Sequence, residues 1–191
     1  MDAKIEKLKK INPINEEGIP KNKGNCQWCA IEGARVLLEG VEPKEIPNFE
    51  GGNDPLEERV HYKHGSDEVR SKESKDFFSE IDKLKAGELM IVSLESDDLD
   101  HAYIIYVDDE KKAHLIDPDR QVFVPLNKNE KNFHQAVRGW DEVSTVNYLN
   151  GDINSDFRSK VKVCMCVLNK AAVEHNPLPE YGSEPSEKLD Y

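Results

Sequence analysis

The sequence is poor in basic and in apolar residues. Among its 191 residues, 26 Lys and Arg are outnumbered by 38 Asp and Glu, and the formal net charge is -12. A surface so acidic repels the phosphates of nucleic acids and of anionic membranes. The charge balance therefore argues against nucleic acid and membrane partners, and it favours a protein or small-molecule partner.

Long apolar runs are also lacking. No stretch approaches the roughly 18 to 20 apolar residues of a membrane span, and residues 1–10 have no apolar segment of the kind that signal peptides carry. We expect synthesis in a cytoplasm without a signal peptide, which leaves export by a signal-independent route open. The four cysteines are too few for a disulfide framework in a chain of this length, so we expect thiols.

What the sequence does contain is a run of helical patterns followed by a run of strand patterns. The helices are predicted at 1–10, 26–39, 71–85 and 141–149, and the strands at 88–94, 101–107, 113–117, 121–126 and 160–168. This order indicates an α+β fold with helices packed on an antiparallel sheet of about five strands. Residues 43–62 are interpreted as an irregular connection, residues 1–175 as one catalytic domain, and residues 176–191 as a disordered, acidic, Pro-rich tail.

Cys26 stands at the start of a predicted helix, directly after Gly24 and Asn25. Helix N-termini favour the thiolate form of a cysteine, and a free backbone N–H in the first turn can bind an oxyanion. Gly24 would let a substrate amide approach closely. A cysteine in an apolar helix is more often a small core residue, so this position alone does not establish a nucleophile.

His101 and Asp117 lie at the outer ends of two predicted strands that are joined by an acidic turn. If the strands pair as a hairpin, both residues fall at the same end of the sheet, near the helix that carries Cys26. Asp117 would then accept the Nδ1–H of His101 and leave Nε2 to take the thiol proton. These three residues are the predicted catalytic set.

The other histidines and cysteines have plainer interpretations. We expect solvated side chains for His61, His64, His134 and His175, and His114 alternates to the strand face opposite Asp117. Cys164 and Cys166 share one face of an apolar strand and are expected in the core. A zinc site built from them with Cys26 and Cys29 fits poorly, because zinc ligand pairs usually sit on tight turns. We therefore expect no metal and no cofactor.

Several segments resemble the papain-fold toxin family, and within it the OspI-like effector glutamine deamidases of bacteria. They are Ile11-Asn12-Pro13, Gly24-Asn25-Cys26-Gln27-Trp28-Cys29-Ala30, Leu38-Glu39-Gly40, residues 86–95 (AGELMIVSLE), His101 and Leu115-Ile116-Asp117. The resemblance implies a papain-like cysteine-enzyme fold, with Cys26 rather than Cys29 as nucleophile, His101 as base and Asp117 as the orienting group. The chain departs from the family after Asp117, where many members have Asp-x-Gln and this sequence reads Asp-Pro-Asp-Arg-Gln.

By this resemblance the chain is expected to convert a glutamine of a target protein to glutamate through a thioester. The implied targets are host signalling proteins such as those of the ubiquitin pathway, reached after secretion from the bacterial cytoplasm into a host or target cell cytosol. A secretion chaperone or an immunity protein would be a further partner. A papain-like cysteine protease and a non-catalytic binding module remain as alternatives, because the same three residues would serve the first and be vestigial in the second.

Overall fold

A computed structural model of the chain describes residues 1–49, 54–69, 79–95, 100–126 and 162–183. The predicted helix at 71–85 lies partly outside these residues, and its described part is helical at 79–82. The predicted helix at 141–149 and His134 lie outside the described residues.

The centre of the molecule is an antiparallel open sheet of six strands in the order β1-β6-β2-β3-β4-β5. The strands are β1 (Asp67–Val69), β2 (Leu89–Glu95), β3 (Asp100–Val107), β4 (Ala113–Asp117), β5 (Val122–Pro125) and β6 (Lys162–Leu168). All five predicted strands are therefore confirmed. The short edge strand β1 was missed because three residues are too few for an alternation to be recognised.

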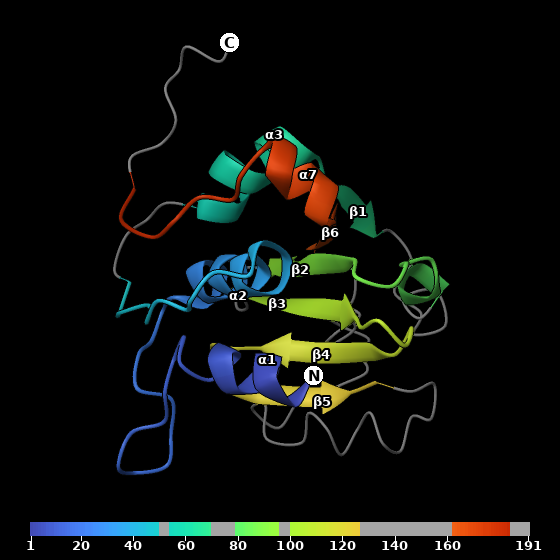
Figure 1. Cartoon of the computed structure of the whole chain (residues 1–191). Coiled ribbons are helices and arrows are strands. Elements are labelled where there is room, and N and C mark those ends of the chain that lie inside the picture. The colour runs from blue at the N-terminus through green and yellow to red at the C-terminus, as the bar shows by residue number, and fades with distance from the viewer. Residues whose placement is uncertain (50–53, 70–78, 96–99, 127–161, 184–191) are drawn as a thin grey trace, which may run out of the picture.

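The helices are α1 (Asp2–Leu8), α2 (Cys26–Glu39), the π-helical turn η1 (Glu57–His61), α3 (Tyr62–His64) and α7 (Lys170–His175). Figure 1 shows α2 lying in front of β2 and β3, with α1 on the same side of the sheet. The prediction of an irregular connection at 43–62 is wrong for its last residues, where η1 turns the buried side chain of Val60 inward. No helix in the part of the chain that the structure describes is long and apolar enough to cross a membrane.

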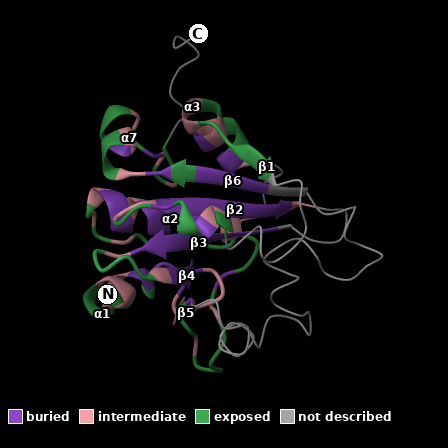
Figure 2. Cartoon of the chain, turned by 90° about the vertical axis from the view of Figure 1, so that its right-hand side faces the viewer, coloured by how far each residue is buried: buried purple, intermediate pink, exposed green. Residues whose placement is uncertain are grey.

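The central strands consist mainly of buried residues, coloured purple in Figure 2, and apolar side chains form a core cluster on each face of the sheet. Alternate residues of β3 point to opposite faces, so Ala102, Ile104 and Tyr106 face α2, while Tyr103 and Ile105 belong to the second cluster. Gly33 lets α2 lie close to the sheet, because a Cβ there would be 2.8 Å from Ile104 Cδ1. This close packing sets the position of the first residues of α2 over the sheet.

The described part of the C-terminal segment, residues 176–183, packs against the rest of the fold. Leu178 is buried, and the ring of Tyr181 meets Trp28 of α2 edge-on at a centroid distance of 5.3 Å. The predicted disorder from residue 176 is therefore wrong for residues 176–183, because Leu178, between two prolines, is buried in the core. Residues 184–191 lie outside the described part.

Candidate active site

Cys26 is the first residue of α2, as the sequence pattern predicts, and its side chain is half-buried. The preceding residue, Asn25, does not cap the helix with its side chain. Its Nδ2 instead donates to the carbonyls of Ile46 at 2.8 Å and Pro47 at 3.2 Å. The helical hydrogen bonds begin with the N–H of Cys29 and the carbonyl of Asn25 at 2.9 Å, so the N–H of Cys26 belongs to the unpaired first turn.

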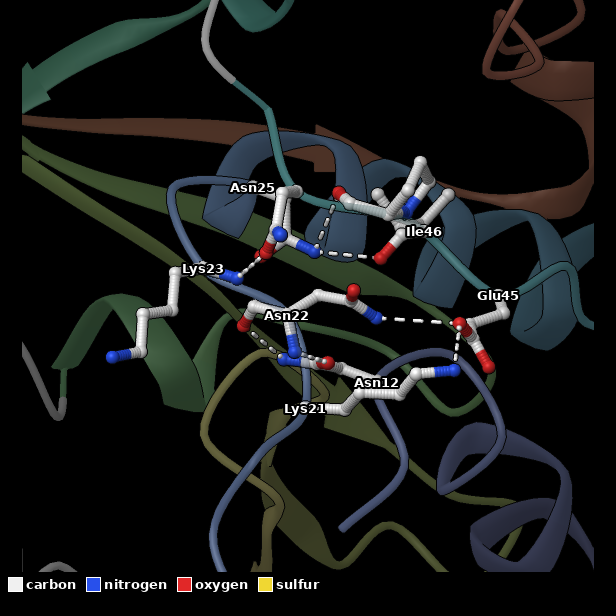
Figure 3. Close-up of polar contacts among 9 residues, drawn as sticks. Asn12, Lys21, Asn22, Lys23, Asn25, Glu45 and Ile46 are labelled. Atoms are coloured by element: carbon white, nitrogen blue, oxygen red, sulfur yellow. Dashed lines mark hydrogen bonds and ion pairs between the residues drawn. The ribbon is translucent and has the colours of Figure 1, made fainter. Parts of the chain in front are cut away.

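A network of side-chain amides holds the loop that precedes Cys26, and Figure 3 shows it. The buried Asn12 accepts from the N–H of Asn22 at 2.9 Å and donates to the Asn22 carbonyl at 3.1 Å. The amide of Asn22 donates to Glu45 at 3.4 Å, and Lys21 forms an ion pair with the same carboxylate at 3.1 Å. The loop is thus attached to the segment that follows α2, which fixes where the helix begins.

Gly24 has a backbone conformation that other residues rarely adopt, with φ at +74°. A Cβ at this position would lie 2.7 Å from the carbonyl oxygen of Phe49. The side of Gly24 on which other residues carry a Cβ is therefore covered by the backbone of Phe49. The expectation that a substrate amide approaches there is wrong. The close packing of backbone on backbone explains the glycine.

His101 and Asp117 meet as predicted, because β3 and β4 pair in the register that sets Ile104 opposite Ile116. Both residues are buried, and His101 Nε2 lies 2.6 Å from Asp117 Oδ2. The predicted ring orientation is wrong, since Nε2 rather than Nδ1 faces the carboxylate. The second oxygen of Asp117, Oδ1, accepts from the N–H of Arg120 at 3.0 Å, so the carboxylate is held on both sides.

The thiol of Cys26 lies near enough to the imidazole of His101 for its hydrogen-bonding and charge to raise the pKa of the ring. With Nε2 occupied by Asp117, Nδ1 is the nitrogen left for the thiol. Burial lowers the pKa of His101, but the charge and hydrogen bond of Asp117 and the contact with Cys26 outweigh it and raise this pKa to about 10. The ring is therefore an imidazolium at neutral pH, which is the partner that a thiolate nucleophile requires.

Asp119 is a site residue that the sequence reasoning treated only as part of a turn. Its Oδ2 lies 3.9 Å from His101 Nδ1, and its side chain is 17% exposed. Burial, together with the nearby charge of Asp117, raises the pKa of Asp119 to about 6, against the opposing effect of His101 and Arg120. The strand register could have identified Asp119, because the pairing of Ile104 with Ile116, if continued, would set His101 opposite residue 119.

The remaining cysteines are packed away. Cys29, Cys164 and Cys166 are buried, and burial raises the pKa of Cys29 well above its usual value and that of Cys166 to about 12. The expectation that Cys164 and Cys166 lie in the core is confirmed. All four cysteines are free thiols.

Within the described residues, the group whose ligand atoms all lie within 4.8 Å of one another consists of His101, Asp117 and Asp119. Two ligands of one zinc ion, each about 2.0 to 2.2 Å from it, stand about 3 Å apart or more. The 2.6 Å between His101 Nε2 and Asp117 Oδ2 is shorter than that and is the length of a charge-assisted hydrogen bond. His101 and Asp117 therefore form a hydrogen-bonded pair in this structure.

Other polar residues considered from the sequence lie outside the site. The Nε2 of His114 pairs with Asp108 at 2.7 Å in the hairpin turn, and His64 Nε2 lies 3.0 Å from the carbonyl of Asn176, so the solvated state predicted for His64 is wrong. Gln121, the glutamine of the Asp-Pro-Asp-Arg-Gln segment that departs from the family pattern, donates to the carbonyls of Pro118 at 3.0 Å and Lys9 at 3.3 Å. Its amide therefore holds the turn after β4 rather than pointing to Cys26.

Comparison of the chain with protein-family models, with curated proteins and with solved structures gives no match.

Proposed function

We propose that this chain is a cysteine-dependent protein-glutamine deamidase of papain-like architecture. The observation that carries the proposal is the chain of contacts from Asp117 through the His101 ring to the thiol of Cys26 at the start of α2. A buried carboxylate, an imidazolium and a half-exposed thiol are the parts that acyl transfer by a cysteine requires.

The first half of the reaction forms a thioester. The Cys26 thiolate attacks the carboxamide carbon of a glutamine side chain, and the oxyanion is bound by the N–H of Cys26 in the first turn of α2. His101 gives its Nδ1 proton to the amide nitrogen as the carbon–nitrogen bond breaks, and ammonia leaves. Asp117 keeps the ring in place through Nε2 and stabilises its charge.

The second half releases glutamate. His101, now neutral, takes a proton from a water molecule that attacks the thioester, and the Cys26 sulfur leaves as thiolate beside the restored imidazolium. The target protein gains one negative charge at the former glutamine. Such a change at a protein interface breaks a hydrogen bond or introduces repulsion, which is enough to disable a signalling contact.

A protein is the substrate that the charge of the chain favours, since a net charge of -12 disfavours nucleic acid. The resemblance noted in the sequence extends the proposal to a bacterial effector secreted into a host or target cell cytosol, with a host ubiquitin-pathway or signalling protein as target. A secretion chaperone or immunity protein belongs to the same proposal.

The test is incubation of the purified protein with a eukaryotic cell lysate, followed by mass spectrometry of intact proteins and peptides. Cys26→Ala is the inactive control, and Cys29→Ala is its matched partner, because it removes a thiol of the same helix that faces the core. The proposal expects conversions of Gln to Glu that disappear with Cys26→Ala and persist with Cys29→Ala. New peptide termini would instead establish a protease, and a lysate without any change would favour a binding module.

A further inference from the structure

The Asp119 carboxylate lies beside His101, and neither the orientation of the His101 ring nor the packing of the fold explains this position. Its backbone carbonyl accepts from Asn12 Nδ2 at 2.8 Å, and its Oδ1 lies 3.4 Å from the same nitrogen. Its other oxygen, Oδ2, is on the side of His101 Nδ1, at 3.9 Å. One carboxylate oxygen is therefore fixed to the protein, and the other is presented beside the ring nitrogen that serves Cys26.

The separation of 3.9 Å between Asp119 Oδ2 and His101 Nδ1 is too long for a hydrogen bond between them. It suits a third atom, because one nitrogen placed about 2.9 Å from each of them completes two hydrogen bonds. Such an atom must donate to a carboxylate and accept a proton from an imidazolium. The amide nitrogen of the group attacked by Cys26 meets both requirements.

We infer that Asp119 Oδ2 accepts a hydrogen bond from the –NH₂ group of the substrate, and thereby selects primary carboxamides over peptide bonds. This inference rests on the proposed deamidase function and names the chemistry that its site recognises. The nitrogen of a primary amide carries two hydrogens, so one N–H can point to Asp119 Oδ2 while the other points elsewhere. The nitrogen of a peptide bond carries one hydrogen, and its carbon substituent occupies one of these two directions. With a peptide bond in the site, Asp119 Oδ2 would be buried without a hydrogen-bond donor, and the cost in free energy disfavours that substrate.

The carboxylate also assists departure of ammonia without taking a proton. As the proton moves from His101 Nδ1 to the amide nitrogen, positive charge passes to that nitrogen, and the adjacent Asp119 carboxylate stabilises it. The carbon–nitrogen bond then breaks, its electron pair stays on nitrogen, and the carbonyl is restored as the Cys26 thioester. Asp119 begins and ends the step ionised.

The experiment measures alkylation of Cys26, followed by peptide mass spectrometry, with three reagents. Iodoacetamide carries –NH₂, its N,N-dimethyl analogue carries no N–H, and iodoacetate is an anion. The variants are Asp119→Ala, which removes the acceptor and the charge, and Asp119→Asn, which keeps an acceptor and removes the charge. Glu110→Gln is the matched control, because Glu110 is a largely exposed carboxylate in the turn between β3 and β4.

With Asp119→Ala, we expect the rate ratio of iodoacetamide to its dimethyl analogue to fall about fivefold, the value of one hydrogen bond. The ratio of iodoacetamide to iodoacetate should fall about tenfold in both Asp119 variants, because a nearby carboxylate no longer repels the anion. Asp119→Asn should retain the preference for –NH₂ to within about twofold, since an amide oxygen still accepts. Glu110→Gln should leave both ratios unchanged.

Equal changes in all three rates with Asp119→Ala would show that Asp119 acts on the thiol or on the fold, and the inference would be wrong. Unchanged ratios would overturn it as well. Each ratio compares two reagents on one protein preparation, so errors in the protein concentration cancel. Failure of this test can be distinguished from failure of the deamidase proposal, because alkylation of Cys26 needs no target protein, whereas the lysate experiment does.

Discussion

Asn12 donates its side-chain amide to the backbone carbonyl of Asp119 at 2.8 Å, across 107 positions of the sequence. The same amide donates to the carbonyl of Asn22, and its oxygen accepts from the Asn22 N–H. One fully buried side chain therefore joins the loop that leads to Cys26 and the turn that follows Asp117. The nucleophile and the two carboxylates keep their relative positions through this residue.

Replacement of Asn12 by Ala should destabilise the fold and loosen the site. The change leaves buried backbone groups of Asn22 and Asp119 without their partner, which costs about 1 to 3 kcal/mol of unfolding free energy. Urea unfolding measures this loss. Asn15→Ala is the control, because Asn15 makes its side-chain hydrogen bonds in an exposed turn, and a loss of equal size there would contradict the role of Asn12.

Asp117→Asn should lower the turnover rate by about four orders of magnitude, the size of this effect in a comparable catalytic triad. The amide no longer carries the charge that opposes the burial of His101, so burial lowers the pKa of the ring. The imidazolium beside Cys26 is then lost near neutral pH. The rate of Cys26 alkylation, followed against pH, should change its profile in the variant, and an identical profile would remove Asp117 from the site.

Gly24→Ala and Gly18→Ala separate backbone strain from close packing. Both glycines have positive φ, +74° and +80°, but an added Cβ meets Phe49 O at 2.7 Å only at Gly24 and finds nothing within 4 Å at Gly18. Gly18→Ala should cost about 1 kcal/mol through its conformation. Gly24→Ala should cost about 1 to 3 kcal/mol more, since the backbone of Phe49 must move. If thermal or urea unfolding gives equal losses of unfolding free energy for the two variants, the contact with Phe49 does not contribute to the cost of Gly24→Ala.

The stability of the fold should depend on pH through Asp119. Its pKa is raised from the usual 3.8 to about 6 by burial and by the charge of Asp117. A carboxyl with a raised folded pKa contributes stability that is fully present below its unfolded pKa and is lost as pH rises through the folded value. The charged form of Asp119 therefore destabilises the protein at pH 7 by about 2 to 3 kcal/mol.

Asp119→Asn should remove that cost. We expect the variant to be more stable than the parent at pH 7 by about 1 to 3 kcal/mol and equally stable at a pH well below 3.8, where Asp119 is protonated in both the folded and the unfolded state. Urea unfolding at the two pH values gives the comparison. A constant difference between the two proteins across this range would contradict the raised pKa. A gain in stability together with the expected fall in the ratio of iodoacetamide to iodoacetate would be typical of a functional residue held at a cost to the fold.

Local patterns were sufficient for much of the architecture. The strands β2 to β6 follow from short apolar, β-branched runs, because alternation of side chains is a property of each strand. The start of α2 at Cys26 and its end at Gly40, a left-handed C-cap, follow from the helical spacing and from the freedom of glycine. The placement of His101 and Asp117 at the same end of the sheet followed from the hairpin pattern, and the structure confirms it.

What needed the folded chain is everything that depends on contacts between distant segments. The ring orientation of His101 is set by which nitrogen meets Asp117 and which is left for Cys26, and alternation carries no information about rotation of a side chain. The position of Asp119 depends on the hydrogen bond that its carbonyl accepts from Asn12, a residue 107 positions earlier in the sequence. Periodicity describes which face a residue occupies, whereas packing between remote loops determines the distances at which its atoms can do chemistry.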